Sequence, residues 1–285
     1  MRARFHCIRL RGSWLFAAGL AVLAALTVTK AAAAARRPAP SLPVIMYHSV
    51  VTEPAKAGQY AVTAAALEED FRALRQAGCV SLTAAEAASR IAAGEPLPEK
   101  SVVITFDDGY LNCLTEALPL LERYDLKATA AVIGSCCERY SETPDPNPAY
   151  ACLDWAQIRE LAASGRVEIA AHSYDMHRLS PRKGASRRRG ESEEDYLAAF
   201  TDDTARVRTL IEENCGITPT TYAFPYGAVS EEALPALRGL GFTVVLTCSE
   251  QINRAELSGG LLILGRFNRP SGISTAAFMK KIGFS

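Results

Sequence analysis

The chain has 285 residues, of which 49% are hydrophobic, and its 31 basic side chains balance 31 acidic ones. A net charge of zero argues against a nucleic-acid-binding protein, which is usually strongly basic, and the apolar content gives no sign of disorder. Without an N-terminal leader of about 36 residues, roughly 250 remain, enough for one large domain with a substantial core.

The first 36 residues have the pattern of an export signal. Four arginines precede an uncharged apolar run of 15 residues at 14–28, and small residues at 31–35 suit signal-peptidase cleavage. A membrane span needs about 20 residues, which the neighbouring threonines and alanines could supply. The leader is therefore a cleaved signal peptide or a retained signal-anchor. Both place the domain outside the cytoplasm, secreted or held at the outer face of the membrane.

A short linker at 37–41 precedes a single domain expected over 42–285, in which apolar strands alternate with amphipathic helices. In chain order we predict strand 42–47, helices 63–77 and 83–93, strand 101–106, helix 112–124, strand 128–133, helix 154–164, strand 167–171, helix 192–213, strand 221–224, helix 230–240, and strands 243–247 and 261–264. This alternation predicts a parallel sheet covered by helices. At this length the expected fold is a (β/α) barrel, whose site lies at the C-terminal ends of the strands.

Histidines and aspartates follow the predicted strands at that end. His48 comes after the first strand, Asp107 and Asp108 after strand 101–106, and His172 after strand 167–171. Asp107 and Asp108 could instead cap the next helix. His172 and His177 would diverge in a helix or a strand, so they can converge only across a turn. The shared position at strand ends favours one common site.

These residue types are those that a catalytic metal centre needs. One aspartate and two histidines give three ligands and leave a fourth position open for water, which is the pattern of catalytic zinc, although other divalent ions are compatible. Asp107 can accept a proton from the water, and His48, the histidine left over, can protonate a leaving amine. Backbone N–H groups in the turn 225–227 can form an oxyanion hole.

Three segments resemble motifs of the NodB-like polysaccharide deacetylases, carbohydrate esterase family four. They are TFDDGY at 105–110, HSYDMH at 172–177 and FPYG at 224–227. The resemblance covers about residues 42–270. It implies a distorted (β/α) barrel that removes N-acetyl groups from polymers of the N-acetylglucosamine type, in the cell wall or in an exopolysaccharide, and releases acetate.

Residue roles follow from the matched motif positions. Asp107 corresponds to the base, and the backbone N–H of Tyr226 corresponds to the oxyanion donor. The metal ligands implied by the resemblance are Asp108, His172 and His177.

The chain departs from the family pattern at two places. The third motif usually begins with an arginine that orients the base, and the C-terminal motif usually carries the acid histidine; both are missing here. The poly-N-acetylglucosamine deacetylase branch has an early Met-Tyr-His segment, like residues 46–48, and a longer spacing between the two histidines. In that branch the early histidine is the acid, which implies His48 here. Arg266 or Arg269 could replace the missing arginine, or either could be a surface residue.

Three further features allow two interpretations each. The charged run 178–195 could be a solvated loop or could contact an anionic wall polymer. Cys152 could pair with Cys136 or Cys137 in an oxidising location, or the three could be small buried side chains. Trp155 could stack on a sugar or pack into the core.

The sequence supports three functions of different kinds. The first is an exported, metal-dependent polysaccharide N-deacetylase. The second is an esterase that removes O-acetyl groups from a polysaccharide, and the third is a non-catalytic glycan-binding wall protein. The expected partner in the first case is an N-acetylglucosamine polymer or peptidoglycan, with no nucleic acid and with membrane contact only through an N-terminal anchor.

Overall fold

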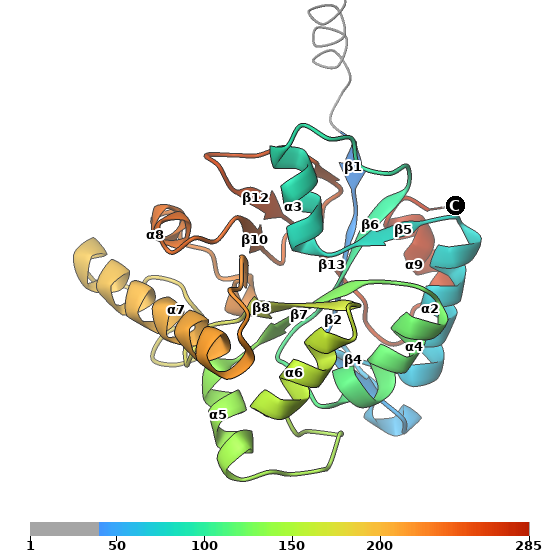
Figure 1. The fold of residues 1–285 in the computed structure, drawn as a ribbon, viewed down its shortest axis with the longest axis horizontal. Coiled ribbons are helices and arrows are strands. Elements are labelled where there is room, and N and C mark those ends of the chain that lie inside the picture. The colour runs from blue at the N-terminus through green and yellow to red at the C-terminus, as the bar shows by residue number, and fades with distance from the viewer. Residues whose placement is uncertain (1–39, 285) are drawn as a thin grey trace, which may run out of the picture. The chain divides into compact units, whose positions relative to one another are not determined.

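The structure is a computed structural model that describes residues 40–284, so the leader and its expected cleavage or anchoring lie outside the described residues. In the described part, a curled parallel sheet is covered by helices (Figure 1). The strands follow the order β12-β10-β9-β8-β7-β6-β2-β13, with β5 also paired to β6. This arrangement confirms the predicted distorted (β/α) barrel, in the form of a curled half-barrel.

The strands of this sheet are short and almost entirely buried. Their bounds are β2 Val44–Tyr47, β5 Val80–Leu82, β6 Ser101–Phe106, β7 Ala128–Val132, β8 Val167–Ala171, β9 Thr221–Ala223, β10 Val244–Leu246, β12 Leu262–Leu264 and β13 Phe267–Asn268. Two small strand pairs flank the sheet: β1 Ser41–Leu42 pairs with β11 Asn253–Arg254, and β3 Ser49–Val51 pairs with β4 Ala61–Thr63.

The helices form the outer layer. Their bounds are α2 Ala64–Gln76, α3 Ala84–Ala92, α4 Leu118–Arg123, α5 Gly134–Glu142, α6 Trp155–Ala163, α7 Glu193–Cys215, α8 Ala233–Gly239 and α9 Thr275–Lys281. Thr63, Asp154 and Ser192 cap their helices as expected, each accepting a hydrogen bond from a backbone N–H in the first turn. No helix of residues 40–284 combines the length and apolarity needed to cross a membrane.

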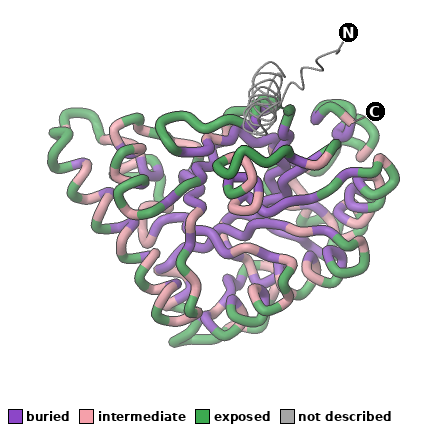
Figure 2. Tube along the Cα trace, turned by 45° about the horizontal axis from the view of Figure 1, so that its top comes forward, coloured by how far each residue is buried: buried purple, intermediate pink, exposed green. Residues whose placement is uncertain are grey.

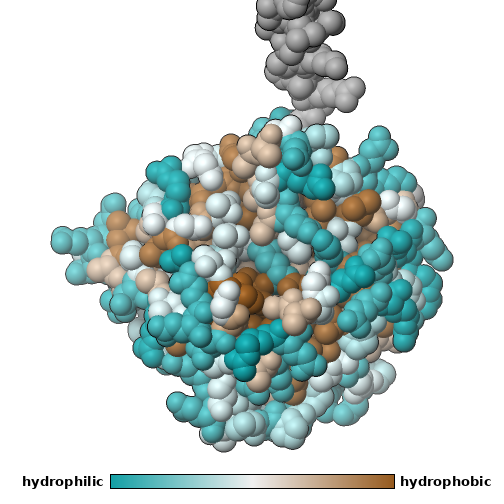
Figure 3. Space-filling view, viewed as in Figure 1, coloured by the Kyte–Doolittle hydropathy of each residue, from teal (hydrophilic) through white to brown (hydrophobic). Residues whose placement is uncertain are grey.

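Alternate residues of each strand face two separate cores. Ile45 and Ala130 belong to the larger core beneath the helices, whereas Val44 and Ala131 belong to a smaller one formed by small and aliphatic side chains. The buried trace in Figure 2 follows the strands through the middle of the molecule. On the face seen in Figure 3, hydrophobic residues gather near the centre and hydrophilic residues surround them.

The two ends of the sheet order are neighbours in sequence, because only Gly265 and Arg266 separate β12 from β13. A Cβ atom at position 265 would lie 2.2 Å from the carbonyl oxygen of Ser249, so a larger residue does not fit there without backbone movement. Arg266 therefore lies in the link between β12 and β13, the two end strands of the curled sheet.

Several predicted elements are wrong in detail. Pro43 interrupts the expected strand 42–47, which divides into β1 and β2. The expected helix 112–124 begins as a π-helical turn, η2 Cys113–Ala117, and continues as α4. Pro119 lacks an N–H for the helical ladder, which accounts for the irregular start. The structure also adds α5 and α9, which sequence patterns did not reveal.

Candidate metal centre and active site

The expected site residues come together at the C-terminal ends of neighbouring strands. Tyr47 of β2 pairs with Phe106 of β6, so the residues that follow each strand, His48 and Asp107, leave the sheet side by side. His172 directly follows β8, another parallel strand of this sheet, so it lies at the same edge. The strand-end arrangement predicted from sequence is therefore present.

Asp108, His172 and His177 form a cluster that could hold a metal ion, with one ligand atom from each lying within 4.8 Å of the others. The Oδ1 atom of Asp108 is 3.5 Å from Nε2 of His172 and 3.1 Å from Nε2 of His177. Zinc bonds of about 2.0–2.1 Å in tetrahedral geometry separate ligand atoms by about 3.3 Å. The spacing of the cluster is compatible with a bound divalent metal ion.

The surrounding groups orient the histidines for this task. Nδ1 of His172 lies 2.8 Å from the carbonyl oxygen of Ala223. A carbonyl can only accept, so Nδ1 carries the proton and Nε2 is left with a free lone pair. Nδ1 of His177 faces the hydroxyl of Tyr226 at 3.4 Å. The buried Oδ1 of Asp108 has no hydrogen-bond partner, and a cation between these atoms would satisfy it.

A tight turn brings His177 back beside His172. Ser173 has a positive φ of 73°, and the carboxylate of Asp203 on α7 accepts hydrogen bonds from the backbone N–H groups of Tyr174 and Asp175, each at 2.8 Å. The start of α5 holds the other side of the turn, because Gly134 N–H donates to Ser173 O at 3.1 Å. Sequence reasoning missed Asp203, since it lies inside a long helix with no motif around it.

Arg266 binds the expected base, Asp107, with two parallel hydrogen bonds. Nη1 lies 2.6 Å from Oδ1 and Nη2 lies 2.8 Å from Oδ2, and both side chains are almost fully buried. Arg266 also donates to the Thr247 carbonyl and the Thr105 hydroxyl. Of the two arginines considered from sequence, Arg266 thus contacts the base. Arg269 instead forms a similar buried pair with Asp70.

These contacts keep both aspartates ionised. Burial by itself would raise the pKa of Asp107, but the charge of Arg266 outweighs it and lowers the pKa below its usual value. Burial would likewise raise the pKa of Asp108, and the positive charge that His172 and His177 carry when protonated lowers it well below the usual range. Two adjacent carboxylates can therefore stay charged at one strand end, because Asp107 faces Arg266 and Asp108 faces the two histidines.

His48 lies beside this pair on the opposite flank from His177. Burial lowers the pKa of its imidazole, and the charges of Asp107 and Asp108 raise it in part. Its Nδ1 is buried without a hydrogen-bond partner. Its ring packs edge-on against Tyr60, with ring centroids 4.9 Å apart.

Tyr226 lies in a strained turn next to the metal cluster. The turn η3 Pro225–Gly227 follows β9, and Tyr226 itself has a positive φ of 56°. Its exposed ring lies 4.5 Å from the ring of His177, between centroids. The turn thus packs the side chain of Tyr226 against the cluster, and the oxyanion role of its backbone N–H stays a prediction.

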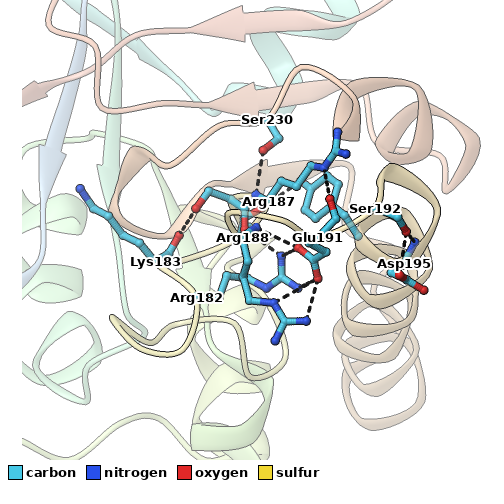
Figure 4. A network of polar contacts seen from close by, with 11 residues as sticks. Arg182, Lys183, Arg187, Arg188, Glu191, Ser192, Asp195 and Ser230 are labelled. Carbon is cyan, nitrogen blue, oxygen red and sulfur yellow. Dashed lines mark hydrogen bonds and ion pairs between the residues drawn. The ribbon is translucent and has the colours of Figure 1, made fainter.

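The charged run 178–195 is largely neutralised within the chain (Figure 4). Glu191, with a side chain only 3% exposed, accepts hydrogen bonds from Arg182 and Arg188, and Arg178 pairs with Asp175. Arg187 donates to the Glu191 backbone carbonyl. These contacts favour the interpretation of a self-contained loop over that of an open cationic surface.

The other features that sequence left open are also placed. Trp155 is 7% exposed and belongs to the larger core, so it packs rather than offering a sugar platform. Cys136 and Cys152 are free thiols, and the Cys152 side chain lowers the pKa of Cys136 to about 7. Cys137 is fully buried. A disulfide from Cys152 to Cys136 or Cys137, the alternative considered from sequence, is not formed in this structure.

Comparisons with known proteins agree with this geometry. The family model described as polysaccharide deacetylase matches residues 94–245, more than half of the chain. An Escherichia coli K12 protein named poly-beta-1,6-N-acetyl-D-glucosamine N-deacetylase is 26% identical over 233 residues, which cover 74% of this chain but 34% of that protein. The chain thus spans about a third of the length of this relative.

Solved structures give the same result over nearly the whole domain. IcaB from Ammonifex degensii superposes with a TM-score of 0.69 at 26% identity, covering 85% of this chain and 97% of that one. A de-N-acetylase from Aggregatibacter actinomycetemcomitans superposes with a TM-score of 0.69 at 25% identity, covering 84% and 99%. The resemblance expected from the three motifs is confirmed, and the chain belongs to the polysaccharide deacetylase family of hydrolases.

Proposed function

We propose that this protein is an exported, metal-dependent N-deacetylase that releases acetate from polymers of N-acetylglucosamine. The observation that carries the proposal is that two adjacent carboxylates at one strand end have different partners. Asp108 belongs to a three-ligand cluster, and Asp107 forms a buried ion pair with Arg266. An amide hydrolase needs both an electrophilic centre and a fixed base.

Asp108, His172 and His177 would hold the divalent metal. A cation there supplies Lewis acidity for the acetamide carbonyl and for the attacking water. Zinc suits one carboxylate and two imidazoles at these spacings, and other divalent ions accept the same ligands.

Asp107 is the general base of this proposal. Arg266 fixes both of its oxygens and keeps the group ionised, so a lone pair of the carboxylate is available to take a proton from water at neutral pH. The backbone N–H of Tyr226, at the rim of the same cluster, would donate to the oxygen on which negative charge develops.

His48 would protonate the leaving amine. Burial favours its neutral form, while the carboxylates of Asp107 and Asp108 favour the charged form that can donate. Burial is the larger effect, so the pKa of His48 lies below its usual value. An amine leaves poorly unless it gains a proton, so the N-deacetylase reaction depends on this residue.

The substrate assignment rests on the relatives. The Escherichia coli protein is named for poly-beta-1,6-N-acetyl-D-glucosamine, and similar names occur for Staphylococcus aureus relatives at 26% identity. The apolar leader with its arginine-rich start supports export to the compartment in which such polymers are found.

The test is acetate release by the purified full-length protein. We expect release from a β-1,6-linked N-acetylglucosamine pentamer that stops on chelation, returns with added Zn²⁺ and is absent from Asp108→Ala. Peptidoglycan and acetylated xylan are offered in parallel. Release from xylan alone would identify an esterase, and binding without release from any polymer would identify a glycan-binding protein.

A further inference from the structure

Tyr60 presents an aromatic ring to solvent beside the active site. Its residue surface is 55% exposed, although large apolar rings are normally buried. The ring contacts His48 edge-on, and its hydroxyl accepts a hydrogen bond from the Gln59 amide at 3.2 Å. The side chain therefore contributes little to the core.

The backbone around Tyr60 is fixed on two sides. Gly58 N–H donates to Ala61 O across the turn at 2.9 Å, and Ser49 N–H, directly after His48, donates to Tyr60 O at 3.1 Å. On the other side, the Asn268 side-chain amide donates to Gln59 O at 2.9 Å. These bonds connect the turn to the end of β2 and to β13, so the exposed ring is held in place next to the acid histidine.

We propose that Tyr60 is a sugar-binding platform that holds the unit of the polymer next to the one being deacetylated. This inference rests on the proposed function. A pyranose ring has an apolar face of C–H groups that packs on an aromatic ring, and polar hydroxyls around its rim that stay in water. A rigid ring with one face in solvent, next to the group that protonates the amine, has the properties that this contact needs.

Tyr226 frames the other side of the site. It is 40% exposed and packs against His177, whereas Tyr60 packs against His48. Tyr226 follows β9, and Tyr60 packs against His48, which follows β2. In the sheet, β8, β7 and β6 lie between β9 and β2, and Asp108 follows β6 while His172 follows β8. A chain of sugars crossing the site would therefore meet an exposed tyrosine on each flank. The enzyme should prefer oligomers over the single sugar.

The test compares substrates of different length. In Tyr60→Ala, we expect KM for an N-acetylglucosamine pentamer to rise about tenfold, in line with the loss of one aromatic contact, while kcat stays within about twofold. Activity on monomeric N-acetylglucosamine should be unchanged. Tyr60→Phe should retain wild-type KM, because the apolar ring face supplies the contact.

Tyr150 provides the matched control. It is 54% exposed and bonds to Asp145 rather than to any site histidine, so Tyr150→Ala should leave KM for the pentamer unchanged. Equal losses on monomer and pentamer in Tyr60→Ala would mean that Tyr60 acts through His48, which overturns the proposal. An unchanged KM for the pentamer would also overturn it.

A binding measurement separates this inference from the proposed function. Calorimetric titration of the pentamer into Asp107→Asn, with and without Tyr60→Ala, requires no turnover. Binding that weakens about tenfold without the ring supports the platform even if no acetate is released by the wild-type protein. Binding that does not depend on Tyr60 rejects it even in an active deacetylase.

Discussion

In the proposed reaction, the buried pair of Arg266 and Asp107 takes the place of the arginine of the usual third motif. Taking both charges out of water is costly, and the cost is offset only when hydrogen bonds satisfy the groups. Arg266 meets that condition through Asp107, Thr105 and Thr247. A different strand end therefore supplies the same bidentate contact to the base.

We expect Arg266→Lys to lower kcat about tenfold or more, with KM and bound metal unchanged. Lysine keeps the charge but lacks the planar fork that fixes both carboxylate oxygens, so Asp107 can rotate away from the water. Steady-state kinetics and metal analysis provide the measurement.

Arg269→Lys is the control for that variant, because Arg269 forms an equally buried bidentate pair with Asp70 and its side chain hydrogen bonds to none of the expected catalytic residues. It should lower the free energy of unfolding and leave kcat near wild type. Full activity in Arg266→Lys, or equal kinetic losses in both variants, would contradict the orienting role.

At the scale of single residues, sequence reasoning found the groups that belong to recognisable motifs. It could not choose between Arg266 and Arg269, because the two differ by three positions and only the register of β13 decides which one faces Asp107. Asp203 and Tyr60 were missed because their roles depend on contacts with distant segments.

Among the elements, the loop between β8 and α7 is organised around one carboxylate. Glu191 accepts bonds from Arg182 at 2.6 Å and from Arg188 at 3.0 Å, and these contacts lower its pKa to about 2. The hydroxyl of Tyr196 donates to Ala185 O at 2.9 Å from the first turns of α7. The loop that follows His177 is therefore stabilised by ion pairs between one buried carboxylate, that of Glu191, and the arginines around it.

The contribution of Glu191 should depend on pH. Its pKa in the folded protein lies below the value of about 4.3 in an unfolded chain, so its stabilisation is complete above the unfolded value and disappears as the pH falls toward 2. Glu191→Gln should lower the free energy of unfolding by about 1–3 kcal/mol at pH 7 and by less at pH 3. Urea unfolding at both pH values measures this.

Glu193→Gln is the comparison, since that side chain is 61% exposed and only 4.0 Å from its nearest arginine partner. It should change stability little at either pH. A deficit in Glu191→Gln that is the same at pH 3 and pH 7 would show that shape, rather than charge, accounts for the effect.

Elements with a strong pattern were predicted well, and those without one were not. Helix α7 has a serine cap and a glycine stop, and its predicted range of 192–213 lies within two residues of the structure. Helix α5 begins with Gly-Ser-Cys-Cys and lacks a side-chain cap, so its formation depends on packing against α6 and α7. The π-helical turn η2 precedes Pro119. A proline in the sequence indicates an irregular helix but does not tell which irregular form the preceding turn takes.

At the scale of the whole molecule, the parallel sheet and its barrel-like form could be predicted, but the order of its strands and the link between its two ends could not. Alternation of strands and helices indicates a parallel sheet, but the half-barrel depends on the two-residue link at Gly265 and Arg266 and on the close approach to Ser249. That link is short, and it brings Arg266 to the base. The same short link therefore connects the two end strands of the sheet and contains the arginine that pairs with Asp107.

The metal cluster joins segments that follow β6 and β8, so metal binding should stabilise the whole domain. A ligand that binds only the folded state at 100 times its Kd adds about 2.7 kcal/mol, which raises Tm by about 5–10 °C for a domain of this size. We expect Zn²⁺ to raise the Tm of the wild-type protein and chelator to reverse the rise. Calorimetry or circular dichroism measures the shift without any substrate.

Asp108→Ala should abolish the metal-dependent rise in Tm, since two histidines alone bind a divalent ion weakly. Asp145→Ala, which removes a carboxylate outside the cluster, should retain it. An equal rise in Asp108→Ala would place the metal elsewhere, and the interacting thiols of Cys136 and Cys152 would be the next residues to change. Loss of the rise in Asp108→Ala alone would connect the stability of the sheet to the same carboxylate that the proposed reaction requires.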